Sequence, residues 1–282
     1  MKTWAIFLAA CILSGCGAPR IREAQLPSAA DLRFRHNART SAIERLWARA
    51  VVEVRWTDER GKRRFEQGDG YLLFSKPDQV ALSLGKLGEK WYWLGGDAQR
   101  FWWFDLNPQD DKLNTAYVGY HHDIDPQNPD PQLLVPPRQF IGLLGLTDLP
   151  ESAQMRAGDA RRIAGPDKLA VAFHVPADPA AGTLEQRIVL GTVSGRPLEI
   201  AYIDAGGATI ASAKLGRYQS MQTVGPAVPT RIELTVPARK AELKISLEAM
   251  SGEADRFSDA QFDFESLARS LKPERIETIG PR

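Results

Sequence analysis

The chain has 282 residues, of which 25% are charged and 43% hydrophobic, and its formal net charge at pH 7 is +1. These values are ordinary for a globular protein that buries a sizeable core. They exclude a strongly basic surface, so we expect no nucleic-acid partner.

Residues 1–15 have the features of a leader. Lys2 supplies a positive charge, Trp4 to Leu13 form a short apolar run, and Leu13-Ser14-Gly15-Cys16 follows. A run this short does not span a bilayer as a folded helix would. The segment resembles a bacterial lipoprotein signal peptide, which implies that Cys16 becomes the N-terminus and carries an acyl anchor such as palmitate. The alternative is an ordinary secretory signal with an incidental cysteine.

The cysteine count agrees with an acyl anchor. The chain has two cysteines, and Cys11 lies in the leader, so Cys16 would be the sole cysteine of the processed chain. Two or three acyl chains bind a membrane stably, whereas one binds only marginally. The next residue is Gly17 rather than Asp, and by the same resemblance we expect the periplasmic face of the cell outer membrane. Residues 16–30 read as a flexible tether that spans about 20 Å.

The fold is expected to occupy residues 31–282, beginning with a helix from Asp31 to about Ala48. Leu32, Ile43, Leu46 and Trp47 would share its apolar face. Strands then dominate, because apolar residues recur at every second position. The predicted strands are 49–57, 63–74, 80–84, 89–94, 100–106, 116–121, 169–175, 184–193, 198–203, 208–218, 230–236 and 243–249.

Helical signals interrupt the strands at two further places. Pro136-Pro137 could open a short helix that contains Phe140, and residues 262–271 could end a strand and begin a helical turn. The tally is eleven or twelve antiparallel strands, which is too much sheet for a flat array. The predicted fold class is therefore mainly β (α+β). We expect a strongly curved antiparallel half-barrel of about eleven strands, with two or three helices covering its concave face.

The segment from Leu82 to Phe104 is unusually aromatic. It holds four of the seven tryptophans, and its strands are apolar on both sides. Such strands must be covered on both faces, or one face must line an apolar space. The first alternative is a dense core with tryptophan as filler. The second is a cavity wall for an acyl ligand, and it is favoured because cores usually reserve Trp for sites where its N–H finds a partner.

The order of these elements is helix, meander, long loop with a short helix, and second meander. Two runs carry a resemblance to the lipoprotein-sorting family of the carrier LolA and the outer-membrane receptor LolB: DGYLLFSKPDQVALSLGKLGEKWYWL, and GRPLEIAYIDAGGATIASAKLGRY followed by PTRIEL. The resemblance implies a half-closed barrel with helices plugging its hydrophobic side. It also implies binding of lipoprotein acyl chains for sorting or transfer, with a periplasmic carrier protein as a partner.

The candidate binding residues follow from these two arguments. The predicted apolar lining consists of Trp56, Trp91, Trp93, Trp102, Trp103 and Phe140. Leu87, in the tip GKLGEK, matches a membrane-contacting leucine in the receptor's PLG loop, with Lys86 in place of Pro; the alternative is that it folds back onto the barrel rim. The carrier's cavity arginine is not placed, because Arg49, Arg55, Arg63 and Arg64 are all candidates.

The remaining groups of polar residues do not indicate a catalytic or metal-binding site. Adjacent histidines such as His121 and His122 point to opposite faces of a strand, so they chelate a metal poorly. No phosphate-binding glycine loop or nucleophile elbow stands out, and we expect no enzyme activity, no cofactor and no metal. The basic cluster 62–64 is either a solvated hairpin tip or a contact for anionic headgroups. The rival function is a structural or scaffolding envelope lipoprotein that binds a protein partner.

Overall fold

The computed structural model describes residues 26–58, 60–86, 88–106, 113–124, 134–177, 184–221 and 225–280. Within these ranges the helices are α1 (Ala29–Ser41), α2 (Pro137–Leu143) and α3 (Phe264–Leu271), with short 3-10 helices η2 (His121–Asp123), η4 (Pro237–Arg239), η5 (Ala254–Arg256) and η6 (Asp259–Phe262). The strands are β1 (Arg45–Thr57), β2 (Arg63–Ser75), β3 (Gln79–Lys86), β4 (Glu89–Gly96), β5 (Arg100–Asp105), β6 (Thr115–Tyr120), β7 (Gln154–Arg162), β8 (Leu169–Val175), β9 (Glu185–Gly191), β10 (Pro197–Ile203), β11 (Thr209–Ser220), β12 (Ala227–Val236), β13 (Ala241–Ser251) and β14 (Arg275–Ile279). None of the helices in this part of the chain is long and apolar enough to cross a bilayer.

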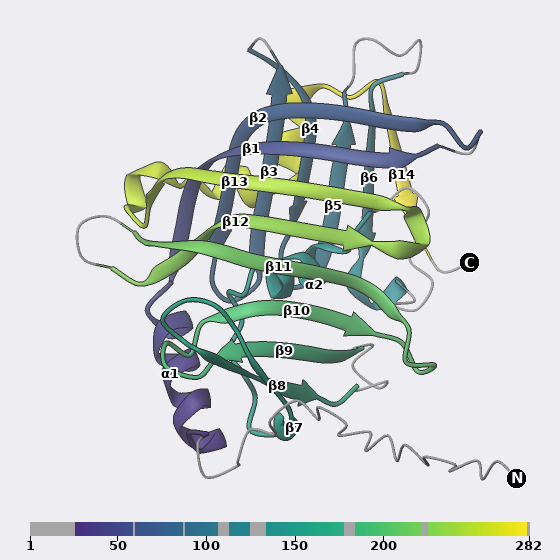
Figure 1. The fold of residues 1–282 in the computed structure, drawn as a ribbon. Helices are drawn as coiled ribbons and strands as arrows, with labels where there is room; N and C mark the ends of the chain where they lie inside the picture. The colour runs from purple at the N-terminus through teal and green to yellow at the C-terminus, as the bar shows by residue number, and fades with distance from the viewer. Residues whose placement is uncertain are drawn as a thin grey trace, which may run out of the picture.

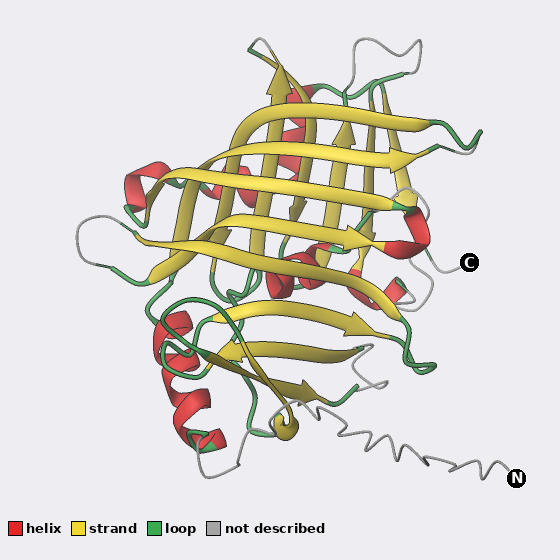
Figure 2. Cartoon of the chain, viewed as in Figure 1, coloured by secondary structure: helices red, strands yellow, loops and turns green. Residues whose placement is uncertain are grey.

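The strands form one strongly curved sheet (Figures 1 and 2). Its order is β14-β6-β5-β4-β3-β2-β1-β13-β12-β11-β10-β9-β8-β7, and all neighbours are antiparallel except β14 and β6. The sheet does not close, because β14 and β7 remain as its two edges. The predicted mainly β, curved half-barrel is therefore confirmed, with fourteen strands in the described residues rather than about eleven.

The two strands that the sequence did not indicate are the two edges. β7 reads QMRAGDARR and β14 reads RIETI, and neither has a clean apolar alternation. Charged residues and bulges are common on edge strands, where they discourage pairing with another chain. β7 has such a bulge, since its register against β8 shifts between Arg156 and Arg161.

The first helix is shorter than predicted. Ser28 caps α1, its hydroxyl accepting a hydrogen bond from the Asp31 amide at 3.1 Å, and the helix ends at Ser41. β1 then begins at Arg45, so Leu46 and Trp47 lie on a strand and not on the helix. Leu46 is buried between neighbours that are exposed or half-buried, which is the two-residue alternation expected of a strand. The same alternation continues along β1.

Two long connections cross the sheet on opposite faces. The segment from β6 to β7 joins strands near opposite edges, so it crosses the concave face and carries α2, which contacts both β4 and β10. The segment from β13 to β14 crosses the other face and carries η6 and α3. α3 therefore covers the outer face, whereas the prediction placed all helices on the concave one.

Each crossing segment seals one apolar layer. We call the apolar residues buried on the concave face the inner cluster; they come from α1, α2, the loop after α2, and the inward-facing positions of β1–β5 and β8–β13. The outer cluster is Leu73, Ala81, Trp93, Trp102, Phe104, Leu106, Ala116, Phe262, Phe264 and Leu267. The doubly apolar strands β4 and β5 are thus covered on both sides.

Candidate hydrophobic binding site

The concave face is apolar from its sealed centre to one open end. Along β1, Ala48, Ala50 and Val52 are no more than 1% exposed and belong to the inner cluster. The alternation carries the same face on to Trp56, which is half-buried and packs against that cluster. The alternation of apolar residues therefore extends the apolar concave face along β1 almost to the end of that strand.

The six predicted lining residues do not lie together. Trp103 and Phe140 belong to the inner cluster, Trp56 and Trp91 pack against it, and Trp93 and Trp102 belong to the outer cluster. Adjacent residues on a strand point to opposite faces, which is why Trp102 lies in the outer cluster and Trp103 in the inner cluster. A single cavity lined by all six residues is therefore ruled out by the arrangement of β4 and β5.

Trp91 reaches the inner face because of a bulge. The sequence predicts that Trp91 and Trp93 face the same way, but the β3–β4 register shifts between Leu84 and Gly85. Trp91 then lies over Gly68, where a Cβ would meet its ring at 2.7 Å. The bulge moves one tryptophan of the pair from the outer face to the inner one.

The outer aromatic residues pack beneath the C-terminal helix. The ring of Phe264 on α3 lies 6.2 Å from Trp102 and 5.7 Å from Phe104, between ring centroids. The indole N–H groups of Trp93 and Trp102 are buried and have no hydrogen-bond partner among the described residues. Tryptophan on this face therefore acts as core filler, as in the first of the two alternatives.

A groove of about 610 Å³ lies between the end of the β1–β2 hairpin and the β12–β13 turn, and we call it the hairpin groove. It lies mostly on the outer face of the sheet, because Arg55, Phe65 and Glu242 are directly opposite one another and alternate with the inward-facing Trp56. Its lining residues are Arg55, Trp56, Thr57, Arg63, Arg64, Phe65, Thr235, Lys240, Ala241 and Glu242. Trp56, Arg64 and Ala241 alternate with the other strand residues of this list and face the inner cluster, so the sheet itself separates the groove from the apolar interior.

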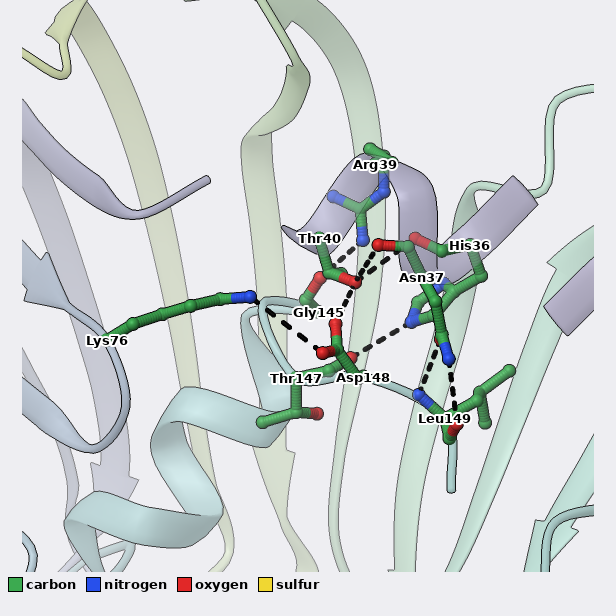
Figure 3. Close-up of polar contacts among 9 residues, drawn as sticks. All are labelled: His36, Asn37, Arg39, Thr40, Lys76, Gly145, Thr147, Asp148 and Leu149. Atoms are coloured by element: carbon green, nitrogen blue, oxygen red, sulfur yellow. Dashed lines mark hydrogen bonds and ion pairs between the residues drawn. The ribbon is translucent and has the colours of Figure 1, made fainter. Parts of the chain in front are cut away.

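At the other end, α1 is fastened to the loop that follows α2 (Figure 3). The Asn37 side chain donates to the Leu149 carbonyl at 3.0 Å and accepts from the Leu149 amide at 2.8 Å. Thr40 donates to Asp148, whose carboxylate also lies 3.8 Å from the Lys76 ammonium. These contacts tie α1, the loop and the end of β2 into one closure over the interior.

Arg39 is the most buried charge in this closure. Its guanidinium donates to the Gly145 carbonyl at 2.5 Å and to the Ala227 carbonyl at 3.3 Å. Burial lowers the pKa of Arg39 below its usual value, but an arginine remains charged at neutral pH. Gly145 follows Leu144, the C-cap of α2, and has a φ of +70°, a left-handed conformation that glycine adopts without strain. Its carbonyl accepts the hydrogen bond from Arg39.

His36 lies one helical turn before Thr40 and is only 1% exposed. Its Nε2 lies 3.0 Å from the Thr147 carbonyl, which requires that nitrogen to carry the proton and donate. Desolvation, followed by the neighbouring Arg39 charge, lowers the pKa of His36 to about 4. The residue is therefore neutral in the closed state at neutral pH.

The depressed pKa makes the closure sensitive to acid. Between pH 6.5 and pH 4 the unfolded chain binds a proton at His36 that the folded chain does not, so stability falls as the pH falls through this window. We expect this loss to reach about 3 kcal/mol. Urea unfolding of His36→Gln, which keeps a donor without a titrating group, should lack this part of the decline. If the free energies of unfolding of the parent and of His36→Gln fell in parallel as the pH is lowered, this role of His36 would be contradicted.

Comparison with solved structures identifies the architecture. The chain is similar to a DUF1329 family protein from Desulfovibrio piger, with a TM-score of 0.57, 12% identity, and coverage of 84% of this chain and 96% of that one. It is also similar to a LolA superfamily protein from Nitrosomonas europaea, with a TM-score of 0.53, 9% identity, and coverage of 85% and 99%. The chain has the LolA-like fold. No protein-family model and no curated protein matches the sequence, and identities this low establish the fold alone.

Within this LolA-like fold, several predicted residues have a place and others do not. Cys16 and Leu87 lie outside the described residues. The four arginines weighed as a cavity arginine, Arg49, Arg55, Arg63 and Arg64, are all exposed. Arg39 was missed, because the predicted helix placed it on the polar side. The spacing of Leu32, His36, Arg39 and Thr40, at i, i+4, i+7 and i+8, could have shown that all four share one face.

Proposed function

We propose that this protein is a periplasmic lipoprotein, anchored in the outer membrane through Cys16, that binds a hydrophobic ligand on its concave face. The proposed ligands are the acyl chains of lipoproteins, which the protein receives or hands on during sorting. The observation that carries the proposal is the apolar concave face of this LolA-like fold, whose inner cluster is covered by α1, α2 and the loop after α2 instead of by a second sheet.

Binding in the interior requires the closure to open. α2 and the loop after it fill the concave face, and Phe140, Leu143 and Leu146 are each no more than 3% exposed. An acyl chain would replace these side chains against the sheet, gaining about 0.8 kcal/mol per buried methylene. Opening breaks the contacts of Asn37, Arg39 and Thr40 and exposes apolar side chains, so the bound chain offsets the cost of opening. No bond is made or broken in this cycle.

Two further elements of the proposal concern the membrane. An acylated Cys16 followed by the tether would hold the LolA-like domain near the lipid surface. Leu87, on the β3–β4 hairpin, would insert into lipid and gain roughly 1.5–3 kcal/mol, enough for reversible contact. A periplasmic carrier protein would deliver or collect the acylated cargo.

Trp56→Glu tests the proposed route. The change puts a carboxylate on the concave face near the end of β1, beside the inner cluster, where an incoming apolar ligand would desolvate it. In a full-length chain that also carries Cys16→Ser, so that no anchor competes, we expect N-phenyl-1-naphthylamine to bind at least about tenfold more weakly. The probe's fluorescence reports binding directly.

Trp47→Glu is the matched control for this experiment. Trp47 lies on the same strand, half-buried, but packs with the outer cluster. Its replacement should leave probe affinity unchanged. The proposed route would be contradicted if the parent, Trp56→Glu and Trp47→Glu bound the probe with equal affinity. It would also be contradicted if both variants lost probe affinity to the same extent.

The rival function is a structural or scaffolding lipoprotein, and one observation favours it. The inner cluster consists of side chains of the protein itself, so these side chains fill the concave interior of the described half-barrel. A domain that never opens would act through its surface on an envelope protein. Failure of N-phenyl-1-naphthylamine and of a neutral monoacylglycerol to bind the intact protein would support this second function.

A further inference from the structure

The end of the β1–β2 hairpin and the β12–β13 turn lie on the same side of the molecule, and both line the hairpin groove (Figure 1). Residues 55–65 hold five cationic residues and two acidic ones, and residues 235–242 hold two cationic residues and one acidic one. The whole chain has a net charge of only +1. These two chain segments therefore carry a local excess of positive charge, which favours a partner of the opposite sign.

The cations on the outer face of the groove flank an exposed aromatic ring. Arg55 and Phe65 are directly opposite each other, and the Arg55 guanidinium lies 5.2 Å from the centre of the Phe65 ring. Arg63 comes two residues before Phe65 on β2, so it shares the same face. Phe65 is 53% exposed and belongs to none of the buried clusters of the described residues. The groove therefore presents an unburied apolar ring beside positive charges.

Two of the cations that line the groove are available to an anion from outside the protein. Arg55 and Arg64 have carboxylate partners, at 3.3 Å and 2.8 Å respectively. Arg63 and Lys240 are exposed and take part in no ion pair within the described ranges. Glu242 is the one acidic side chain among the described residues that line the groove, so it does not balance them.

The neighbouring β3–β4 hairpin leads toward the same side of the molecule. Gly85 on β3 pairs with Asp69 on β2, and Asp69 lies four residues, or about 13 Å of strand, from Phe65. β3 runs antiparallel to β2 and therefore toward the β1–β2 hairpin. Leu87, which is proposed above to enter lipid, comes directly after β3. The exposed ring and the available cations are thus close to the hairpin that carries the proposed membrane contact.

We propose that the hairpin groove contacts an anionic lipid bilayer, with Arg63 and Lys240 binding headgroup phosphates and Phe65 entering the headgroup layer. This inference rests on the membrane contact of the proposed function and extends it, because it requires a negatively charged lipid surface. Arginine and lysine both bind phosphate, and phenylalanine together with cationic side chains is typical of surfaces that bind at the lipid interface. An acidic protein would match the cations but would offer no apolar layer for Phe65.

Vesicles that differ in charge test this inference. The full-length chain carrying Cys16→Ser is mixed with phosphatidylcholine vesicles, or with vesicles in which about a third of the lipid is phosphatidylglycerol, and bound protein is measured by sedimentation. We expect at least about twentyfold tighter binding to the anionic vesicles at low salt, since each cation near such a surface contributes about fivefold. At about 1 M salt, where the Debye length is about 3 Å, the two affinities should converge. Residues 1–30 are the same in every variant, so a difference between variants arises in the folded domain.

Matched variants locate the contact. Arg63→Gln with Lys240→Gln should reduce the preference for anionic vesicles by at least about tenfold, whereas Arg63→Lys with Lys240→Arg should retain it. Arg162→Gln with Lys214→Gln removes two exposed cations that do not line the groove, and should leave the preference unchanged. Phe65→Ser should weaken binding to the anionic vesicles at least about threefold, because the ring no longer enters the headgroup layer.

The outcomes separate this inference from the proposed function. Equal binding of the parent to both kinds of vesicle overturns the headgroup contact, as does a preference that survives in Arg63→Gln with Lys240→Gln. An equal loss in Arg162→Gln with Lys214→Gln also overturns it, because net charge alone would then explain the binding. Unchanged binding of Phe65→Ser would overturn the part assigned to its ring. All these variants should bind N-phenyl-1-naphthylamine as the parent does. Failure of the parent to bind that probe, with its preference for anionic vesicles intact, would contradict the proposed ligand site and not the headgroup contact.

Discussion

Replacing Arg39 with methionine is expected to lower the free energy of unfolding by about 2–5 kcal/mol. Methionine fills much of the same volume but leaves the carbonyls of Gly145 and Ala227 without their donor. Each unsatisfied buried carbonyl costs about 1–3 kcal/mol. Because these bonds hold α1 and the loop after α2 closed, the variant should also bind N-phenyl-1-naphthylamine more tightly, wherever it remains folded.

Arg33→Met is the control for this prediction. Arg33 lies on the same helix and donates one exposed hydrogen bond, to the Glu151 carbonyl at 3.1 Å. Its loss should cost less than about 1 kcal/mol and leave probe affinity unchanged. Urea unfolding followed by far-UV circular dichroism gives the stabilities. Similar results for the two variants would mean that Arg39 does not hold the closure.

Replacing Trp102 with alanine is expected to have the largest effect on stability, about 3–5 kcal/mol. Trp102 is fully buried against Phe264, and removing it leaves a cavity beneath α3. Gly95, whose missing Cβ makes room for the indole, cannot fill that space. Since Trp102 lies in the outer cluster, the folded fraction of the variant should bind the hydrophobic probe as the parent does.

Trp103→Ala provides the comparison. Trp103 is the next residue on β5, is 3% exposed and stacks on Tyr117 at 4.6 Å between ring centroids, but it belongs to the inner cluster. Its loss should destabilise the protein by a similar amount and also alter probe affinity. If Trp102→Ala abolished probe binding in protein that remains folded, the assignment of the ligand to the inner face would be wrong.

The interior strands could be predicted from the sequence because their neighbours impose a pattern. Strand β8 has the bounds predicted, and β1 shows the expected alternation from Ala48 to Val52. β7 and β14 each have one neighbour, so less of their surface must be apolar and the period-two signal is lost. The bulge beside Leu84 is likewise a local feature of pairing, and alternation alone placed Trp91 with Trp93.

The candidate site was harder to predict because it depends on which segment crosses which face. The sequence indicated that β4 and β5 are apolar on both sides, and the two crossing segments explain why: α2 covers one side and α3 the other. Neither crossing follows from local pattern, since the first depends on β6 and β7 lying near opposite edges of the sheet and the second on β14 pairing with β6. Arg39 escaped notice for a related reason, because its acceptors at Gly145 and Ala227 are distant in sequence.

The most direct test of the central claim is to locate a bound acyl chain. A monoacylglycerol with a diazirine on its chain is photolysed with the full-length chain carrying Cys16→Ser, and the labelled peptides are identified by mass spectrometry. The proposed function predicts labels on inner-face residues such as Trp56, Trp91, Trp103 and Phe140, and none on Trp93 or Trp102. Labels confined to the outer cluster or to exposed side chains such as Phe34, or no labelling at all, would contradict it.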